Sequence, residues 1–349
     1  MVSIIIPTHN SSNSIIALLL CIQKTALKEY EVVIVDDAST DSTVEVCKTI
    51  GVHQIIQFEQ QQGPARARNV GASNAQGEIL IFIDSDVTWS KDSDLILKIY
   101  EIFQNNTEID CIATISDVHP TIGNSIAYNN SIYHQYYIHK LFNGKNSVCQ
   151  RMMFFSSRLG GIRKNKFKDS GGFHESLKTV MGEDGEFWNR CYYLNYKVYL
   201  DRTLVHSHAY PTRFWRFIKS YFLATMVHYF ISKKMDTTPD VTISNVEKLR
   251  RLYVCSMLLW PALFFFMPFI YFLIFLLIGI TMFILLFGTI NNLIWKYVPK
   301  RYVIQWYLVY IAITPFIVGG YVYGIYLYAR GVPLLKGKPS TLSFFTKSS

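Results

Sequence analysis

The sequence contains six cysteines but no Cys-x-x-Cys pair. Each cysteine lies in an apolar or helical stretch that is typical of buried thiols, so we expect a reducing compartment. We also expect no secretory signal, because the opening Met-Val-Ser-Ile-Ile-Ile-Pro is too short an apolar run for one. We therefore expect the N-terminal part to stay in the cytosol. The cysteines are Cys21, Cys47, Cys111, Cys149, Cys191 and Cys255.

Charge is missing from residues 252–295. As one straight helix this segment would measure about 66 Å, roughly twice the thickness of the hydrocarbon core of a bilayer. Pro261 and Pro268 offer break points for a pair of spans, and residues 302–329 form a further apolar segment. The cations on both sides of that further segment favour a cytosolic position, which leaves two spans, three spans or a re-entrant last segment open. They are Lys296, Lys300 and Arg301 before it, and Arg330, Lys336 and Lys338 after it.

The formal net charge of +9 is compatible with nucleic acid, anionic lipid or a phosphorylated ligand. A basic cluster just before the uncharged segment favours the membrane, because positive charge flanks spans on the cytoplasmic side. Residues 213–234 place Arg213, Arg216 and Lys219 at helical spacing among aromatic residues. This helix either lies in the headgroup plane or packs on the domain; we expect a membrane partner and no nucleic acid. The cluster consists of Lys233, Lys234, Lys248, Arg250 and Arg251.

Short β-branched runs alternate with helical patterns over the first hundred residues. This alternation predicts an α/β fold with a mostly parallel sheet that is covered on both faces. Residues 105–170 are irregular and polar, and they predict no definite element. The predicted strands are 2–6, 31–35, 55–58 and 79–83, and the predicted helices are 12–24, 41–50, 64–75 and 92–104.

Polar residues follow the first two predicted strands. Pro7, Thr8 and Asn10 follow the first, and Asp37 follows the second in Val-Asp-Asp-Ala-Ser-Thr-Asp. Ligands of open α/β sheets bind at the carboxyl ends of the strands, where a carboxylate can accept from a nucleobase or a ribose hydroxyl. The alternative is a pair of acids that form turns and cap helices.

Asp84, Ser85 and Asp86 follow the fourth predicted strand. Two carboxylates one residue apart at the tip of a strand can share a divalent cation that also binds pyrophosphate oxygens and water. A lone Asp-x-Asp motif is weak, but its strand-end position about fifty residues after the first acidic cluster strengthens the prediction.

Two later segments add candidates. Glu183 and Asp184 lie at the start of a predicted helix, where a carboxylate can act as general base, although the helix dipole also favours acids there. His206 and His208 follow an apolar stretch. Neutral imidazole can complete the coordination of Mn²⁺ begun by Asp86, whereas a histidine at a strand end is often a plain edge residue.

As an ordered set, these motifs resemble those of family 2 inverting glycosyltransferases. The set spans residues 2 to about 210 and is specific in its order, although each motif alone is common. The run Val-His-Ser-His-Ala-Tyr also resembles bacterial rhamnosyltransferases and related cell-surface polysaccharide enzymes. The motifs are Ile-Ile-Ile-Pro-Thr-His-Asn, Val-Asp-Asp-Ala-Ser-Thr-Asp-Ser-Thr, Gly-Pro-Ala-Arg-Ala-Arg-Asn-Val-Gly, Asp-Ser-Asp, Gly-Gly-Phe and Gly-Glu-Asp.

The resemblance implies a GT-A fold that transfers a sugar from a nucleotide-sugar donor, such as a UDP- or dTDP-sugar. It implies that Asp37 binds the nucleobase and that Thr8 and Asp84 approach the nucleoside. It further implies that Asp86 binds Mn²⁺ or Mg²⁺ and that Asp184 is the general base.

Arg66 and Arg68 match the Ala-Arg-Asn helix of that family, either as phosphate contacts or as structural ion pairs. The Gln-x-x-Arg-Trp motif of processive synthases is absent, which favours transfer of a single sugar. Polyprenyl-phosphate sugar transferases resemble this chain in architecture but generally lack the Glu-Asp element. Asp184 therefore favours a hydroxyl acceptor, which we expect on a lipid-linked sugar or a glycolipid at the cytosolic leaflet.

The sequence thus predicts an integral protein of the cell membrane with its catalytic domain in the cytoplasm. The alternatives are a polyprenyl-phosphate glycosyltransferase and a non-catalytic membrane subunit that binds a nucleotide sugar without turning it over. The predicted regions are a GT-A catalytic domain over 1–212, an amphipathic interfacial helix and basic linker over 213–251, a transmembrane region over 252–330 and a tail over 331–349.

Overall fold

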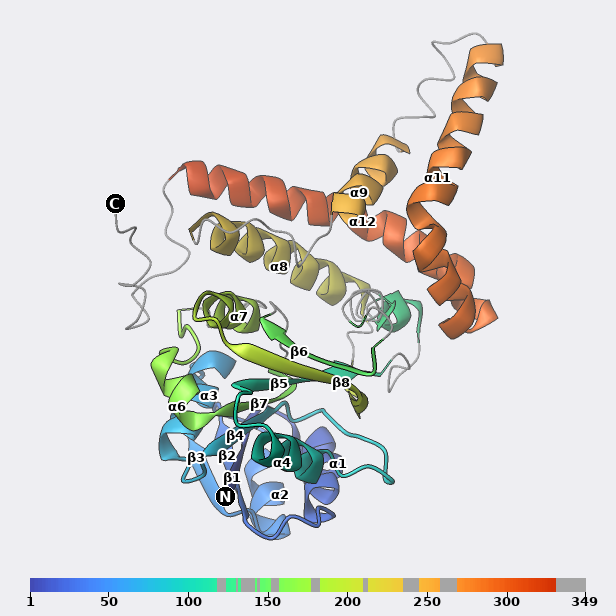
Figure 1. The fold of residues 1–349 in the computed structure, drawn as a ribbon. Coiled ribbons are helices and arrows are strands. Elements are labelled where there is room, and N and C mark those ends of the chain that lie inside the picture. The colour runs from blue at the N-terminus through green and yellow to red at the C-terminus, as the bar shows by residue number, and fades with distance from the viewer. Residues whose placement is uncertain are drawn as a thin grey trace. The chain divides into compact units, whose positions relative to one another are not determined.

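The chain forms two compact units, which Figure 1 shows in a computed structural model. The first unit draws on Met1–Asp117 and Phe142–Ala209, and the second on Val118–Leu141 and Tyr210–Val332. Pro261, Pro268 and the predicted tail lie outside the described residues. The residues described are 1–117, 124–129, 131–132, 142, 145–151, 157–176, 183–209, 213–234, 245–257 and 269–330.

The first unit is built on one mixed sheet with the strand order β3-β2-β1-β4-β7-β5-β8-β6. β1 pairs in parallel with β2 and β4, and β2 pairs in parallel with β3, so these strands end at one edge. The strands are β1 (Val2–Thr8), β2 (Tyr30–Asp36), β3 (Gln54–Gln57), β4 (Ile79–Ile83), β5 (Cys111–Ser116), β6 (Ser147–Arg151), β7 (Leu159–Arg163) and β8 (Lys197–His206).

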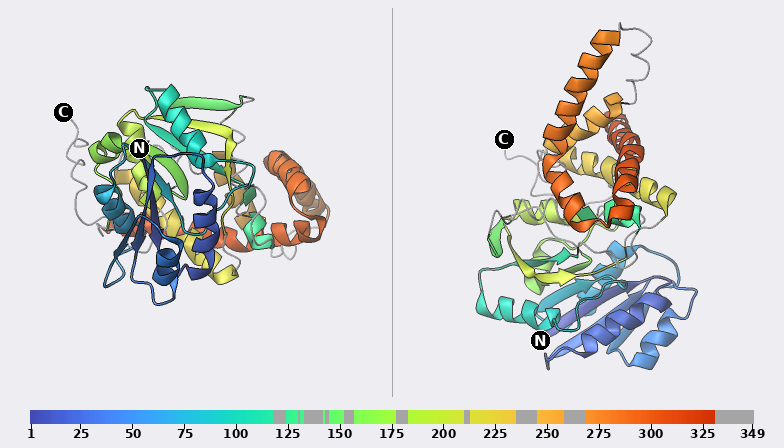
Figure 2. Two further views of the ribbon diagram at one scale, coloured as in Figure 1. Left: turned by 90° about the horizontal axis from the view of Figure 1, so that it is seen from below. Right: turned by 90° about the vertical axis from the view of Figure 1, so that its right-hand side faces the viewer.

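Helices cover both faces of the parallel part of the sheet (Figure 2). The predicted strands and helices of the first hundred residues are confirmed within a few residues at each end. Helix α3 packs closely on β1, because a Cβ at Gly71 would clash with the side chain of Ile5. The helices of this unit are α1 (Ser12–Gln23), α2 (Thr43–Ile50), α3 (Pro64–Asn74), α4 (Leu95–Asn105), α6 (Lys164–Asp169) and α7 (Glu183–Tyr193).

The second half of the sheet is mixed. β7 runs antiparallel to both β4 and β5, β8 is parallel to β5, and β6 is antiparallel to β8. β7 passes beneath α4 at Gly161, where a Cβ would lie 2.9 Å from the ring of Phe103. A glycine pair in a buried strand carries no β-branched signal, which explains why no element was predicted over this part of the sequence.

The second unit is helical. It contains α8 (Phe214–Lys234), α9 (Asn245–Met257), α11 (Phe269–Tyr297) and α12 (Lys300–Ala329). Two stretches, Phe269–Gly288 and all of α12, are long and apolar enough to cross a bilayer by length and composition, with mean hydropathies of 2.9 and 1.8. Only 6% of the first stretch is buried inside the protein, against 33% of the second.

The cysteines are all free thiols. Cys47, Cys111 and Cys191 are buried, as expected, and Cys21 and Cys255 are partly buried. The prediction is wrong for Cys149, which is exposed on β6. β6 is an edge strand of the sheet, and edge strands expose side chains that an apolar context would otherwise assign to the core.

Candidate active site

The carboxyl ends of β1, β2 and β4 meet at one edge of the sheet, and the polar residues that follow them are joined by hydrogen bonds. Thr8 Oγ1 donates to Asp36 Oδ1 at 3.1 Å. The hydroxyl oxygens of Ser11 and Ser85 lie 2.8 Å apart. Asn10 Oδ1 accepts from the backbone N–H of Thr40 at 2.9 Å. The structure therefore brings the first two predicted polar clusters and the Asp84–Asp86 turn into one place.

Asp37 shapes the loop that leads into α3. Its buried carboxylate accepts from the backbone N–H groups of Gln62 at 2.6 Å and Gly63 at 2.9 Å. Gly63 has a φ of 92°, a positive value that glycine adopts without strain. An ionised carboxylate has about four acceptor sites, so these two bonds leave Asp37 capacity for a ligand donor.

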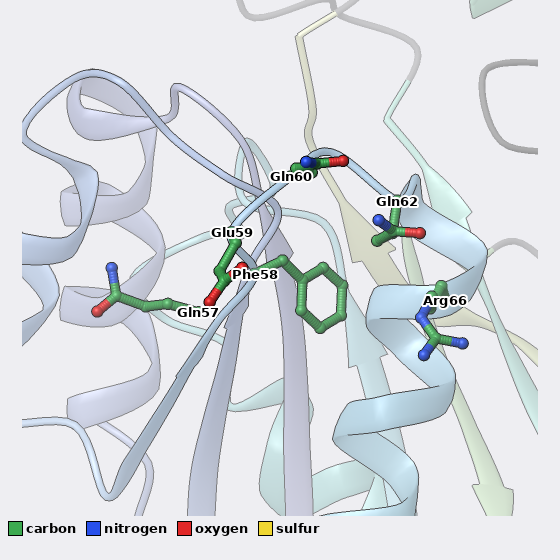
Figure 3. Close-up of a pocket in the computed structure, with 6 residues that line it drawn as sticks. All are labelled: Gln57, Phe58, Glu59, Gln60, Gln62 and Arg66. Atoms are coloured by element: carbon green, nitrogen blue, oxygen red, sulfur yellow. The ribbon is translucent and has the colours of Figure 1, made fainter.

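An open hollow of about 440 Å³ lies beside this loop. Figure 3 shows the Phe58 ring between the segment after β3 and the first turn of α3, from which Arg66 extends. Arg66 Nη1 also donates to Glu175 Oε2 at 2.7 Å in an exposed ion pair. The hollow offers an aromatic face, amide groups and a cation next to Asp37. Its lining comprises Gln57, Phe58, Glu59, Gln60, Gln62 and Arg66.

Arg68 joins two acidic segments that lie about a hundred residues apart in the sequence. Its side chain is only 3% exposed, and it donates to Asp84 Oδ1 at 2.6 Å and to Glu183 Oε1 at 2.9 Å. Burial alone would lower the pKa of Arg68, but the charges of Asp84 and Glu183 outweigh it and raise that pKa. Of the two roles predicted for Arg68, the structure supports the ion pair.

Asp86 lies at the same turn with its carboxylate half-buried. Burial, and next the negative charge of Asp84, raise the pKa of Asp86 to about 6, although Arg158 opposes this shift. The backbone N–H of Ala209 also donates to Asp86. This carboxylate is therefore held in a setting where a positive charge would favour its ionised form.

Asp184 lies in the first turn of α7, next to Glu183. Its carboxylate is partly exposed, and Oδ1 accepts from the backbone N–H of Gly185 at 2.9 Å. Glu183 is buried against Arg68, and both its burial and the charge of Asp184 raise the pKa of Glu183, while Arg68 opposes the shift. The helix thus presents one carboxylate to Arg68 and leaves the next one at the surface of the site.

A network that the sequence analysis did not assign holds α7 in place. Arg190 is fully buried and donates to Glu186 Oε1 at 2.7 Å and to the backbone carbonyl of Gly172 at 2.5 Å. Asn69 of α3 bonds the backbone N–H and carbonyl of Phe173, both at 2.8 Å. Gly172 has a φ of +71°, and a Cβ there would lie 2.7 Å from Asn69 Oδ1. The Gly-Gly-Phe motif was the available signal for this network.

His206 is a core residue of β8. Its Nδ1 lies 2.9 Å from Thr114 Oγ1, and its Nε2 lies 3.2 Å from Ser116 Oγ. Because Thr114 already donates its hydroxyl hydrogen to the carbonyl of Leu159, Nδ1 must be the donor to Thr114 and Nε2 the acceptor from Ser116. A role for His206 as a metal ligand stays a prediction, and it would require Ser116 to release Nε2.

His208 lies in the segment that leaves β8 next to Asp86. The backbones of Thr88 and Ser207 bond each other at 2.8 and 2.7 Å, which places this segment along the turn after β4. His208 is 5% exposed, and its ring centroid is 5.9 Å from that of His206. Its position next to the Asp86 turn is the one expected of a further ligand, and this role also stays a prediction.

Residues 3–171, which hold the edge cluster, the Arg68 helix and the Gly-Gly-Phe motif, match the model described as Glycosyl transferase family 2. This part of the chain is a family 2 glycosyltransferase domain. The predicted membership of family 2 glycosyltransferases is therefore confirmed.

Curated relatives are glycosyltransferases by name. An uncharacterized glycosyltransferase of Haemophilus influenzae is 27% identical over 192 residues, which cover 54% of this chain and 60% of that protein. Glycosyltransferase GlyA of Streptococcus pneumoniae is 28% identical over 222 residues, which cover 58% of this chain and 30% of that protein. This chain thus spans less than two thirds of the length of these relatives.

The solved structure of a mannosyltransferase from Pyrobaculum calidifontis, in complex with GDP-Man and Mn²⁺, has the same fold. It superposes with a TM-score of 0.63 at 16% identity and covers 93% of this chain and 87% of that one. The GT-A fold predicted from the motifs is confirmed.

Asp86, in the turn after β4 of the family 2 domain, is suited to be one ligand of a divalent cation. No group of three or more His, Cys, Asp or Glu side chains within the described residues is placed to hold a metal ion. Asp86 fits nevertheless, because a cation would offset the burial and the repulsion from Asp84 that together raise the pKa of Asp86. Donor phosphate oxygens and water are the hard oxygen ligands that such an ion prefers for its other positions.

Proposed function

We propose that this chain transfers one sugar from a nucleotide-sugar donor to a hydroxyl of a lipid-linked or glycolipid acceptor at the cytosolic membrane face, with inversion at the anomeric carbon. The observation that carries this proposal is the bridge made by Arg68. It joins the Asp84–Asp86 turn to the start of α7, which supports the assignment of Asp86 and Asp184 to one site.

The donor lies along the carboxyl edge of the sheet. Its nucleobase enters the hollow beside Asp37, whose carboxylate keeps acceptor capacity beyond its bonds to Gln62 and Gly63, and it packs on Phe58. The donor then passes toward the Asp86 turn along a path lined by Thr8, Asn10, Ser85 and the chain after Pro7. Mn²⁺ or Mg²⁺ supplies positive charge to the departing diphosphate when it is bound at Asp86.

Asp184 accepts the proton of the acceptor hydroxyl. The acceptor oxygen forms a bond to the anomeric carbon as the bond from that carbon to the diphosphate oxygen breaks, and the nucleoside diphosphate leaves with the electron pair. Asp184 suits this role because it is partly exposed and is not bound to Arg68, whereas Glu183 is buried in that ion pair.

An acceptor in the membrane is supported by the second unit. Its two long apolar stretches and the exposed cations of α8 suit a protein that works on the bilayer surface. The relatives in Haemophilus and Streptococcus are glycosyltransferases by name, and the structural neighbour was solved with a nucleotide sugar and Mn²⁺.

Release of nucleoside diphosphate by detergent-solubilised protein tests the proposal. A panel of nucleotide sugars with Mn²⁺ is offered with and without cell lipid extract. Asp86→Ala is the variant, and Asp92→Ala is the matched control, because Asp92 is an exposed acid of the same loop.

We expect release with one donor, dependence on lipid, loss in Asp86→Ala and retention in Asp92→Ala. Donor binding without any release would overturn the proposal in favour of a non-catalytic subunit. A product labile to mild acid would instead identify a polyprenyl-phosphate acceptor.

A further inference from the structure

Helices α8 and α12 run side by side in the same direction (Figures 1 and 2). Phe217 and Ile218 of α8 cluster with Ile313 and Ile317 of α12. Further along both helices, a Cβ at Gly320 would clash with the backbone carbonyl of Phe222. The pair is therefore in contact over several turns, and both helices must take the same orientation in any membrane.

Cations lie beside the middle of α12. Arg213, Arg216 and Lys219 are exposed at the start of α8, next to the two residues that pack on Ile313 and Ile317. Arg251 of α9 donates to Thr314 Oγ1 at 3.1 Å, and its guanidinium lies 4.5 Å from the ring centroid of Tyr310. The central turns of α12 are thus flanked by positive charge from two other helices.

A helix of 30 residues is about 45 Å long, so the middle of a spanning α12 would sit near the centre of the hydrocarbon. The flanking cations would then lie where charged side chains are strongly disfavoured. If α12 instead lies in the headgroup plane, the exposed cations of α8 reach anionic headgroups, and the basic ends of α12 at Lys300 and Arg330 stay on one side.

Helices α9 and α11 have a different character. They are antiparallel, because Arg250 bonds the carbonyl of Leu286 and the Tyr253 hydroxyl donates to the carbonyl of Gly279 at 2.5 Å. The sequence from 252 to 295 has no charged residue, and the apolar stretch of α11 is mostly exposed, with 6% of it buried. The apolar stretch Phe269–Gly288 of α11 is therefore suited to hydrocarbon.

We propose that α8 and α12 lie as a pair in the headgroup plane of an anionic cytosolic leaflet, and that, among the described helices, α11 enters the hydrocarbon with its apolar stretch Phe269–Gly288. The inference rests on the membrane attachment proposed above. It places both ends of α12 on the face that carries the catalytic unit, and it gives Arg213, Arg216 and Lys219 the role of headgroup contacts.

Cysteine labelling of the full chain in oriented vesicles tests this topology. Lys300→Cys and Arg330→Cys replace exposed residues at the two ends of α12, and the exposed native Cys149 marks the face of the catalytic unit. A membrane-impermeant maleimide is applied to inverted and to right-side-out vesicles, and mass spectrometry identifies the labelled peptides.

We expect both introduced cysteines to be labelled only in the vesicles in which Cys149 is labelled. Labelling of either end of α12 from the opposite face would overturn the inference while leaving membrane attachment intact. Extraction of the protein by alkaline carbonate would overturn membrane attachment as well, so the two failures are distinguishable.

The charge contacts are tested on Trp215→Cys, because Trp215 is 72% exposed next to Arg216. We expect its labelling to be lost in vesicles that contain phosphatidylglycerol and restored by the triple change Arg213→Glu, Arg216→Glu, Lys219→Glu. Charge reversal at three exposed lysines of the first unit is the matched control and should leave the protection unchanged. Equal labelling in anionic and zwitterionic vesicles would overturn the headgroup role. The control lysines are Lys24, Lys28 and Lys48.

Discussion

Arg68 binds one carboxylate in each of the two acidic pairs of the site, Asp84 after β4 and Glu183 at the start of α7. The second carboxylate of each pair contacts backbone N–H groups instead: Asp86 accepts from Ala209, and Asp184 accepts from Gly185. Each pair therefore divides into a carboxylate that orients the segment and one that is available to a ligand. The order of the two roles is the same in both pairs.

The two available carboxylates differ in their surroundings. Asp86 is next to Asp84 and sufficiently enclosed for its pKa to rise to about 6, which suits a group that binds a cation. Asp184 is partly exposed in the first turn of a helix, where a carboxylate is accessible to an incoming hydroxyl. The comparison predicts that substituting the two carboxylates of one pair has unequal effects on activity. Single substitutions test this prediction.

The largest difference is expected between Asp184→Asn and Glu183→Gln. Asp184→Asn should lower kcat by about 10² to 10⁴, because general base catalysis typically contributes that much. Glu183→Gln keeps a hydrogen-bond acceptor for Arg68 and should cost about tenfold or less, since it affects only positioning. The turnover rate for the same donor and acceptor is the measurement. A rate for Asp184→Asn within a few-fold of the unchanged protein would show that the base assignment is wrong.

Replacement of Arg68 by lysine tests the bridge itself. Lysine keeps the charge but cannot hold Asp84 and Glu183 together with the planar fork of arginine, so kcat should fall by about 10- to 100-fold. The thermal unfolding midpoint is measured in parallel, because leaving a buried carboxylate unpaired costs about 3 to 5 kcal/mol. Arg202→Lys, at an exposed arginine of the same unit, is the control. A lower unfolding midpoint without a change in kcat would show that the bridge is only a structural contact.

The first four strands could be predicted from the sequence because each is a short run of buried β-branched residues with a helical pattern between them. The edge cluster followed from this, since parallel strands place Thr8, Asp37 and Asp84 at one edge of the sheet. The division of roles within each acidic pair did not follow. It depends on which carboxylate Arg68 reaches, and that is a contact across more than a hundred residues.

Other parts of the site carried only a weak local signal. Arg190 and Asn69 hold the Gly-Gly-Phe loop through backbone carbonyls and N–H groups, and such partners leave no mark in a single sequence. His206 shows the converse case, because its motif suggested a ligand while the tertiary fold surrounds it with Thr114 and Ser116. Residue type and spacing indicate which ligands a side chain can bind, whereas its burial and its partners in the fold decide which of its atoms remain available to a ligand.

The proposed metal site should respond to pH in a defined direction. The raised pKa of Asp86, about 6, means that a proton competes with the cation as the pH falls through that value. At pH 5 about a tenth of the carboxylate is ionised, so the half-saturating Mn²⁺ concentration for donor binding should be about tenfold higher than at pH 7.5. Calorimetric titration of the donor at fixed Mn²⁺ concentrations measures it. A constant Mn²⁺ requirement between these pH values would contradict the assignment of Asp86.

The smallest effect is expected outside the Arg68 bridge, at Arg66. Its ion pair with Glu175 joins side chains that are 47% and 40% exposed, and exposed pairs contribute about 0 to 1 kcal/mol to the free energy of unfolding. Arg66→Ala and Glu175→Ala should therefore lower the unfolding midpoint equally and slightly. Arg66 also lines the hollow beside Asp37, so only Arg66→Ala should raise the KM for the donor, by about three- to tenfold if one phosphate contact is lost. If both variants keep the KM of the unchanged protein, Arg66 forms only the ion pair and does not contact the donor. If the KM of Glu175→Ala also rises above that of the unchanged protein, Glu175 is needed to position Arg66 for the donor.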